Sequence, residues 1–401
     1  MAVQPQRLAW MYYLVKALNN ILLFGLIIAF SACAKVEIIP ELVKNEIVLT
    51  NEGRICFVSP LLPEKTFSVE NLQVCHFLDE ARYLNGFTGS LVTQFAVESG
   101  YRMDYPSGYS IMLPDANGGL ISIHVRNATG YPFSFSDVVS SNGGVYEISN
   151  LIPGNLYHYE VRVGDNFKFL SDSIFATGQV RMIKSESGLN VRDIGGWRTR
   201  DGRRIQYGRI YRGAAYSRGF TKRDASVIID QLGVNVEIDL RSETELLLDD
   251  DNPDNDLNFS VFGTGVSYYH YPMPLKDYIY EDKVYVGVFR TVLSSLEQGD
   301  NVYIHCAGGA DRTGTIMLML EALLGVDDSE MAKDYELTSF APLYYDRDNY
   351  RYLERCSSTF NYFSTVSGKM GTTNEITTQY LLSLGVSQQE IDCFKDIMLK
   401  P

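Results

Sequence analysis

Cys306 and Arg312, with five residues between them, form the segment of this chain best suited to chemistry. The intervening residues include Gly308 and Gly309, so the backbone can turn tightly. An apolar run precedes the cysteine and a helical pattern starts at the arginine, which predicts a strand, a loop and a helix. Loop N–H groups and a helix N-terminus attract anions and favour a thiolate. The arginine can grip two phosphate oxygens, so we expect Cys306 to attack a phosphate monoester.

The ten residues His305 to Gly314 resemble the signature of the cysteine-dependent protein tyrosine phosphatase superfamily, His-Cys-x-x-Gly-x-x-Arg-(Ser/Thr). The resemblance implies a phosphocysteine intermediate on Cys306 that water then hydrolyses. It also implies that Thr313 bonds to the departing sulfur and that His305 fixes the loop and tunes the thiolate. The implied phosphate-binding residues are Ala307, Gly308, Gly309, Ala310, Asp311 and Arg312.

A second motif occurs much earlier, in residues 190–197 (NVRDIGGW) and in the turns and strand of residues 201–213. It resembles the amino-terminal signature of a bacterial branch of this superfamily, whose secreted members also act on phosphoinositides. That branch tends to carry Asp-Leu-Arg-Ser at a strand end, as in residues 239–242 here, and to finish with a helix like residues 385–394. The resemblance covers roughly residues 181–401. It implies supporting roles near the site for Asp239, Arg241, Arg192 and Asp193.

Two aspartates compete for the role of the general acid that protonates the leaving oxygen. Most superfamily members carry this acid on a mobile loop upstream of the nucleophile, where Asp277 lies in the sequence PMPLKD. The Trp-Pro-Asp form of that loop is absent. Phosphoinositide phosphatases of the superfamily often use an aspartate at the position of Asp311. We favour Asp311 as the acid and keep Asp277 as the alternative.

The sequence indicates the substrate less directly than it indicates the reaction. Relatives that take phosphoinositides often have a lysine where this chain has Ala310, and the loss of that cation disfavours multiply charged headgroups. Phosphotyrosine in a protein, or another small phosphomonoester, is therefore the favoured substrate. The alternatives are a phosphoinositide or inositol phosphate phosphatase and, in another class, a surface-anchored binding protein with an inactive phosphatase domain.

Composition and charge exclude some partners. The formal net charge of −14 over 401 residues argues against binding to nucleic acid, which requires a basic surface. None of the five histidines has a partner at metal-ligand spacing, so we expect no catalytic metal and no other cofactor.

The amino terminus has the pattern of a bacterial lipoprotein signal peptide over residues 1–33. Arg7 and Lys16 precede an apolar run, residues 21–30, that is too short to span a bilayer, and Cys33 ends a lipobox-like sequence. We expect a lipid anchor on Cys33 and an extracytoplasmic protein on the bacterial outer membrane, periplasmic or surface-exposed. Oxidised pairs are conceivable there, and the sequence leaves free thiols and bridges equally open for Cys56, Cys75, Cys356 and Cys393.

The residues from 34 to about 178 are β-like in pattern. Residues 34–85 carry no assignable signature, and residues 86–178 are predicted to form an all-β sandwich. Residues 151–163 resemble the turn into a strand of a fibronectin type III or immunoglobulin-like domain, where Tyr157 would lock the corner.

From about residue 185 strands and helices alternate, which predicts a mainly parallel sheet covered on both faces, a three-layer α/β fold. The acidic run of residues 249–256 is read as a solvated loop rather than a calcium site, since the glycine and glutamate of that site are missing. The predicted strands are 234–240, 267–271 and 302–305, and the predicted helices are 221–232, 284–297, 313–324, 329–338 and 375–384.

Overall fold

The computed structural model describes residues 46–49, 55–58, 65–79, 108–129, 133–164, 167–216, 220–247, 259–341 and 351–400. The chain forms two compact units, residues 1–62 and 63–401. In the first unit, β1 (Glu46–Leu49) pairs antiparallel with β2 (Ile55–Val58). The predicted signal peptide, its lipidation site Cys33 and the acidic run of residues 249–256 lie outside the described residues. In the part that is described, no helix is long and apolar enough to cross a membrane.

The loop that begins at Cys306 follows β13 of a five-stranded sheet in the second unit, whose strand order is β12-β11-β13-β10-β8. Four neighbouring strands run parallel, and β8 joins the edge antiparallel to β10. The prediction of a mainly parallel sheet is therefore confirmed. The strands are β8 (Arg192–Asp193), β10 (Ile210–Ala214), β11 (Val234–Asp239), β12 (Ser267–His270) and β13 (Asn301–Cys306).

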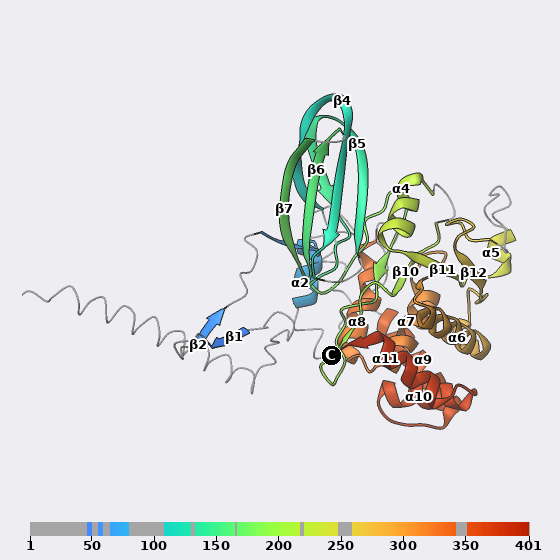
Figure 1. Cartoon of the computed structure of the whole chain (residues 1–401). Coiled ribbons are helices and arrows are strands. Elements are labelled where there is room, and N and C mark those ends of the chain that lie inside the picture. Colours follow the sequence, from blue (N-terminus) through green and yellow to red (C-terminus); the bar gives the residue numbers. More distant parts are fainter. Residues whose placement is uncertain are drawn as a thin grey trace, which may run out of the picture. The chain divides into compact units, whose positions relative to one another are not determined.

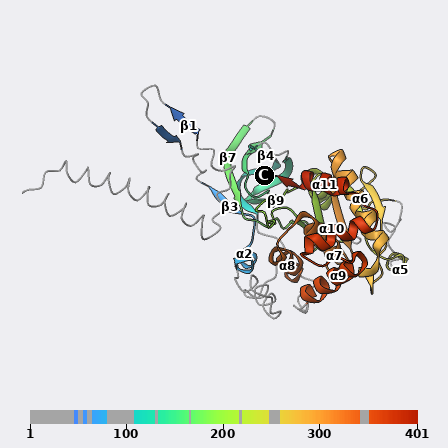
Figure 2. The same ribbon diagram turned by 90° about the horizontal axis from the view of Figure 1, so that it is seen from below.

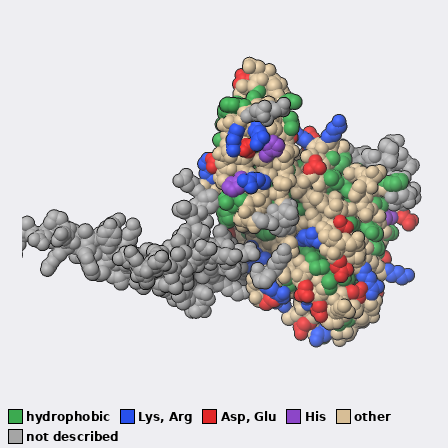
Figure 3. Space-filling model, viewed as in Figure 1, with side chains coloured by type: hydrophobic (Ala, Val, Ile, Leu, Met, Phe, Trp, Pro, Cys, Tyr) green, Lys and Arg blue, Asp and Glu red, His purple; other side chains and the backbone are tan. Residues whose placement is uncertain are grey.

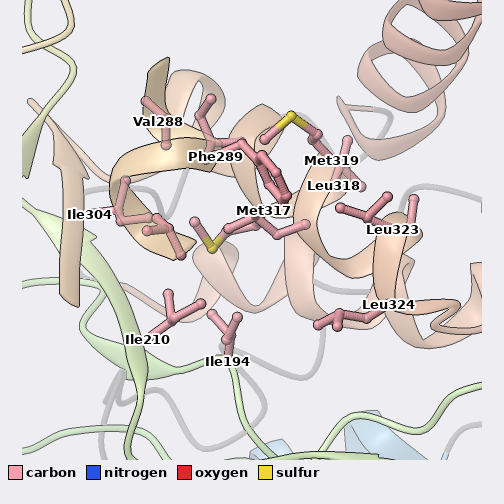
Figure 4. Close-up of a cluster of buried hydrophobic side chains, with 14 of the residues drawn as sticks. Ile194, Ile210, Val288, Phe289, Ile304, Met317, Leu318, Met319, Leu323 and Leu324 are labelled. Carbon is pink, nitrogen blue, oxygen red and sulfur yellow. The ribbon is translucent and has the colours of Figure 1, made fainter. Parts of the chain in front are cut away.

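Helices cover both faces of this sheet because its side chains alternate between two apolar clusters. Ile210 and Ile304 point to one face, where they meet α6 and α7 (Figure 4). Tyr211 and Tyr303 point to the other, where Ile228 packs against them. Helix α7 is itself surrounded by α8, α9 and α10 (Figure 2), so it is buried along its length.

The helical elements of this part of the chain include short 3₁₀ and π segments. They are α4 (Lys222–Ala225), η2 (Ser226–Gln231), α5 (Glu243–Leu247), η3 (Tyr278–Tyr280), α6 (Asp282–Gln298), α7 (Asp311–Leu324), α8 (Asp328–Glu336), η4 (Leu337–Phe340), α9 (Arg351–Ser367), α10 (Thr373–Ser383) and α11 (Gln388–Met398). A second strand pair, β9 (Arg204–Ile205) with β14 (Leu399–Lys400), joins the carboxyl terminus to the turn region before β10.

The described residues between 65 and 177 form a second sheet, in the order β3-β7-β6-β4-β5, with β4 and β5 as a long hairpin (Figure 1). The name β-sheet region is used here for residues 108–177. The hydroxyl of Tyr157 accepts the N–H of Ile152 at 2.8 Å, which is the predicted corner contact. The strands described between residues 65 and 177 form one sheet, so the second sheet of the predicted sandwich stays a prediction. The elements are β3 (Thr66–Ser68), α2 (Leu72–Asp79), β4 (Tyr109–Asn127), β5 (Ser134–Ile148), β6 (Leu156–Val163) and β7 (Phe167–Thr177).

Most predicted elements of the α/β part are confirmed to within two residues. The helix predicted over 221–232 begins as α4 and continues as the π-helix η2, and the one over 329–338 ends in 3₁₀ geometry. Helix α9 was not predicted, because its many Ser, Thr and aromatic residues are poor helix formers. The capping box of Ser387 and Glu390 is confirmed. Cys75, Cys356 and Cys393 are free thiols.

Candidate active site

The predicted loop leaves the carboxyl end of β13 and enters α7 at Asp311, with Cys306 buried at 3% exposure. Gly309 has φ +65°, and a Cβ there would lie 2.2 Å from the backbone of Gly213 in β10. A backbone atom cannot move aside as a side chain can, so only glycine fits. Sequence reasoning expected a tight turn here, and the structure adds that β10 presses directly against it.

Every carbonyl of the loop from Cys306 to Ala310 is bonded to a group outside it or to the helix that follows. The N–H of Ala215 donates to the carbonyls of Cys306 at 2.9 Å and Ala307 at 3.3 Å. Asn190 Nδ2 donates to those of Gly308 and Gly309 at 3.2 and 3.1 Å. The carbonyl of Ala310 accepts the N–H of Gly314 at 2.9 Å in α7.

Arg212 adds a second bond to the loop, since its Nη2 donates to the carbonyl of Gly309 at 2.9 Å. Peptide N–H and C=O groups point in opposite directions. With the carbonyls bonded in this way, the peptide N–H groups of the loop are turned away from these partners, an arrangement that can form an anion-binding nest.

Asp334 on α8 orients the two arginines that support this loop. Its carboxylate accepts Nε of Arg192 at 2.9 Å and also Nη1 of Arg212, and all three side chains are fully buried or nearly so. Burial by itself would raise the pKa of Asp334, but the two guanidinium groups hold it below its ordinary value. Burial and the neighbouring Arg212 lower the pKa of Arg192 to about 10. Arg192 Nη1 in turn bonds Asn190 Oδ1 at 2.6 Å, which fixes the amide that holds the loop.

Arg312 lies on the first turn of α7 and is held from one side by Glu245 of α5. Its Nη2 donates to Glu245 Oε1 at 2.7 Å, and its Nη1 donates to Oε2 at 2.5 Å and to the carbonyl of Met273 at 3.2 Å. Ser242 also donates to Glu245 Oε2. These bonds use the Nη1–Nη2 edge, so the Nε–Nη2 edge of the guanidinium remains for a bidentate oxyanion.

His305 is buried between two carboxylates on β11. Its Nε2 lies 2.8 Å from Glu237 Oε1, and its Nδ1 lies 3.7 Å from Asp239 Oδ1. Asp239 also accepts a two-pronged bond from Arg241, at 2.7 and 3.0 Å. Burial would raise the pKa of Asp239, but His305 and Arg241 lower it to about 2. These contacts fix the imidazole behind the nucleophile.

The two candidate acids differ in their surroundings. Asp311 is half-buried at the start of α7, where its Oδ1 accepts the hydroxyl of Tyr335 at 3.0 Å. Gly314 makes this possible, because a Cβ there would lie 2.6 Å from the Tyr335 ring. Asp277 is exposed, with φ +62° at the start of η3. The hydroxyl of Thr313 is buried and bonds to no described group, and its predicted bond to the departing sulfur stays a prediction.

Sequence reasoning gave no role to several residues that hold the site, among them Glu237, Glu245, Asp334 and Tyr335. Only Glu245 had a local signal, since Ser242-x-x-Glu245 has the spacing of a capping box. Its bond to Arg312 depends on the fold. Within the described ranges, no group of three His, Cys, Asp or Glu side chains could hold a metal ion.

Solved structures resemble this chain only distantly. The core catalytic domain of the PP-IP phosphatase SIW14 from S. cerevisiae is 17% identical and matches with a TM-score of 0.24, over 38% of this chain and 88% of that one. TpbA of P. aeruginosa, solved with pTyr, is 16% identical with a TM-score of 0.25, over 34% of this chain and 74% of that one. Scores of this size support no inference about function. No curated protein matches the sequence significantly.

The sequence profile of the tyrosine phosphatase family matches residues 183–400, which is more than half of the chain. The matched segment holds the sheet, the loop with Cys306, and Arg312. It also holds Glu245, Asp334 and Tyr335, which sequence reasoning did not single out. The chain therefore belongs to the tyrosine phosphatase family.

Proposed function

We propose that this protein hydrolyses phosphate monoesters through a phosphocysteine intermediate, with phosphotyrosine in proteins as its substrate class. The observation that carries the proposal is the geometry around the loop. Cys306 lies at the base of a nest whose carbonyls are all held outward, and Arg312 has one edge fixed by Glu245 and one edge left for an oxyanion. Fixed N–H donors and a guanidinium stabilise the charge that develops on a transferring phosphoryl group.

The reaction takes place in two displacements. The Cys306 thiolate attacks phosphorus, the S–P bond forms and the P–O bond to the leaving group breaks, while Asp311 gives its proton to the departing oxygen. Water then attacks the phosphocysteine, Asp311 takes a proton from that water, and the S–P bond breaks to release phosphate and the thiolate. Tyr335 holds the Asp311 carboxylate in place through its hydroxyl.

Cys306→Ser tests the mechanism. A serine hydroxyl is a far weaker nucleophile than a thiolate, so turnover of p-nitrophenyl phosphate should fall by about 10⁴-fold or more. Cys393→Ser, at a free thiol on α11 that bonds Glu297 instead, is the matched control and should keep full activity. Acid quench of the wild-type reaction with labelled substrate should trap phosphate on the protein, and no trapped label with an unchanged rate in Cys306→Ser would refute the proposal.

Leaving-group dependence identifies the acid. Asp311→Asn should slow phenyl phosphate by about 10² to 10⁴-fold and p-nitrophenyl phosphate much less, because a leaving group of low pKa needs little protonation. Asp277→Asn should affect both substrates only modestly, since its side chain is exposed and bonds to nothing described. The opposite pattern would assign the acid to Asp277.

A substrate panel separates phosphotyrosine from the alternatives. Ala310 puts no cation on the loop, and this favours a singly phosphorylated aryl ester over an inositol headgroup. We expect phosphotyrosine peptides to be hydrolysed faster than phosphoserine peptides, phosphoinositides or phytate at equal concentration. A preference for phosphoinositides would move the assignment to lipid phosphatases. Binding of cell-surface glycans without any turnover would favour an inactive domain.

We also propose that the protein is lipid-anchored through Cys33 and works outside the cytoplasm. The support is the signal-like sequence of residues 1–33. Metabolic labelling with a fatty acid should mark the wild type but not Cys33→Ala. Equal labelling of both would refute the anchor.

A further inference from the structure

The segment that follows β7 is hydrogen-bonded along the edge of the catalytic sheet. The carbonyl of Arg181 accepts the N–H of Asp193 at 3.0 Å, and Ile183 donates to the carbonyl of Val191 at 2.9 Å. Met182 forms an antiparallel bridge with Arg192. Residues 181–183 thus act as an extra strand beside β8, so the connection from the β-sheet region is fixed to the sheet by its backbone.

The Arg181 side chain points back into the β-sheet region. Its Nε and Nη2 donate to the main-chain carbonyl of Asn150 at 3.1 and 2.6 Å, and the guanidinium lies 5.5 Å from the centre of the Phe133 ring. Its Nη1 donates to Asp193 Oδ2 and to the Tyr211 hydroxyl, both at 3.1 Å. The side chain is fully buried, and its neighbours Tyr211 and Asp193 raise its pKa although burial alone would lower it. One guanidinium therefore joins the two regions.

Asn150 makes the junction firm from the other side. It has φ +61°, and its amide accepts the N–H of Lys184 at 2.7 Å and donates to the Lys184 carbonyl at 3.0 Å. The same Nδ2 donates to Gln231 Oε1 of η2 at 3.0 Å. Asparagine is one of the few side chains that tolerate this backbone conformation.

From Arg181 the contacts continue to the phosphate loop. Asp193 is fixed by Arg181 and by the N–H groups of Gly195 and Gly208, at 2.8 and 2.7 Å. It shares the short strand β8 with Arg192, whose Nη1 holds Asn190, the residue that binds two loop carbonyls. A displacement of Asp193 must therefore shift the groups that hold the loop.

We propose that the β-sheet region is a fixed part of the catalytic unit and that Arg181 is a positioning residue for the phosphate loop. The proposal rests on the proposed phosphatase function. The family profile begins at residue 183, so Arg181 and the β-sheet region precede the matched segment. The functional unit thus extends beyond the part of the chain that defines the family.

Arg181→Lys in the full chain tests the proposal. Lysine keeps a positive charge beside Asp193, but it lacks the planar guanidinium that donates to Asn150 and to Tyr211 at the same time. We expect kcat for p-nitrophenyl phosphate to fall about tenfold and the inhibition constant of inorganic phosphate to rise several-fold, since small misplacements of catalytic groups are costly. Arg209→Lys is the control, because Arg209 also bonds two backbone carbonyls, of Gly299 and Leu296, without reaching the loop.

A double variant shows whether the effect passes through Asn190. In an Asn190→Ala background the two bonds from Asn190 to the loop are already lost, so Arg181→Lys should cost less than about twofold. Asn150→Gly keeps the backbone conformation but removes the amide, and it should lower kcat in the same direction, which covers the case in which Arg181→Lys does not fold. Folded variants with wild-type kcat and phosphate inhibition, or a full tenfold loss in the Asn190→Ala background, would overturn the proposal. An inactive wild type would instead refute the phosphatase function.

Discussion

The β-sheet region and the region around the phosphate loop have cores of different chemistry. In the described residues of 108–177 the buried side chains are aliphatic and aromatic, and the polar ones are Ser141 and Asn150. Apolar burial stabilises a fold without fixing the direction of any bond, whereas ion pairs and charged hydrogen bonds are directional. Among the described residues, buried Asp, Glu, His, Lys and Arg side chains begin at residue 181: Arg181, Arg192, Asp193, Arg212, Asp224, Glu237, Asp239, His305, Arg312, Glu321, Lys333, Asp334 and Glu336.

In this molecule, apolar packing stabilises the β-sheet region, whereas charged contacts fix the position of the loop after Cys306. The β-sheet region gains from close packing and reaches the charged network at its corner, where Asn150 meets Arg181. Around the loop, buried charges form ion pairs and directional hydrogen bonds that orient the loop backbone. Substitutions in the two regions should therefore have different signatures.

The largest effect is expected from Asp334→Asn. It removes the carboxylate charge that pairs with both Arg192 and Arg212, and breaking a buried ion pair costs about 3–5 kcal/mol of stability. Activity per folded molecule should fall as well, since both arginines support the loop. Urea denaturation and steady-state kinetics measure the two effects. Asp328→Asn, which removes a surface pair with Arg200, should change stability by less than about 1 kcal/mol.

A smaller loss of stability, without any loss of activity per folded molecule, is expected from Ile123→Ala in β4. Ile123 is fully buried in the β-sheet region, so the cavity should cost about 3 kcal/mol. Activity per folded molecule should stay at the wild-type level. Ile123 lies in the middle of the sheet, and its apolar side chain takes no part in the hydrogen bonds between Asn150 and Arg181. Ile123→Val should cost about 1 kcal/mol. If kcat of Ile123→Ala fell together with its stability, the proposed difference between the apolar core and the charged core would be wrong.

The smallest effect concerns acid stability. The folded-state pKa of Asp239 is lowered to about 2, because His305 and Arg241 outweigh burial. The lowered pKa stabilises the folded state by on the order of 2 kcal/mol. This stabilisation is fully present at pH values above the pKa of a free aspartate, about 4, and is lost as the pH falls from about 4 to about 2. Asp239→Asn should therefore be less stable than wild type at pH 7, with the difference shrinking near pH 2. A constant difference would mean that the carboxylate charge does not stabilise the fold. Asp172→Asn is the control and should show little effect, because Asp172 of the β-sheet region is half-exposed and pairs with Lys65 at the surface.

Sequence alone predicted those parts of the site whose signals are local. The strand, loop and helix around Cys306 are contiguous, so their pattern is legible in one stretch, and residues 190–197 have their own turn chemistry. The alternation of strands and helices likewise predicted the sheet, because both periods appear directly in the sequence.

The rest depends on contacts between distant segments. Glu245 and Asp334 are ordinary helix carboxylates in sequence, and they become arginine partners only when α5 and α8 meet the loop. Tyr335 reaches Asp311 because Gly314 leaves space for its ring. The role of Arg181 was missed because two of its bonds go to the main-chain carbonyl of Asn150, which leaves no trace in residue type. Its side-chain partners, Asp193 and Tyr211, are brought to it by the fold.

The pairing of the arginines near the loop bears on how substrate arrives. Arg192 and Arg212 share the carboxylate of Asp334. Arg241 pairs with Asp239 and Arg312 with Glu245, and the whole chain carries a net charge of −14. Acidic and basic side chains are mixed over the face of the molecule that Figure 3 shows. Association of a highly anionic substrate is opposed by long-range repulsion, which salt screens beyond about 10 Å at 0.1 M. Added salt should accordingly speed the encounter, in contrast to enzymes that steer their anionic substrates electrostatically.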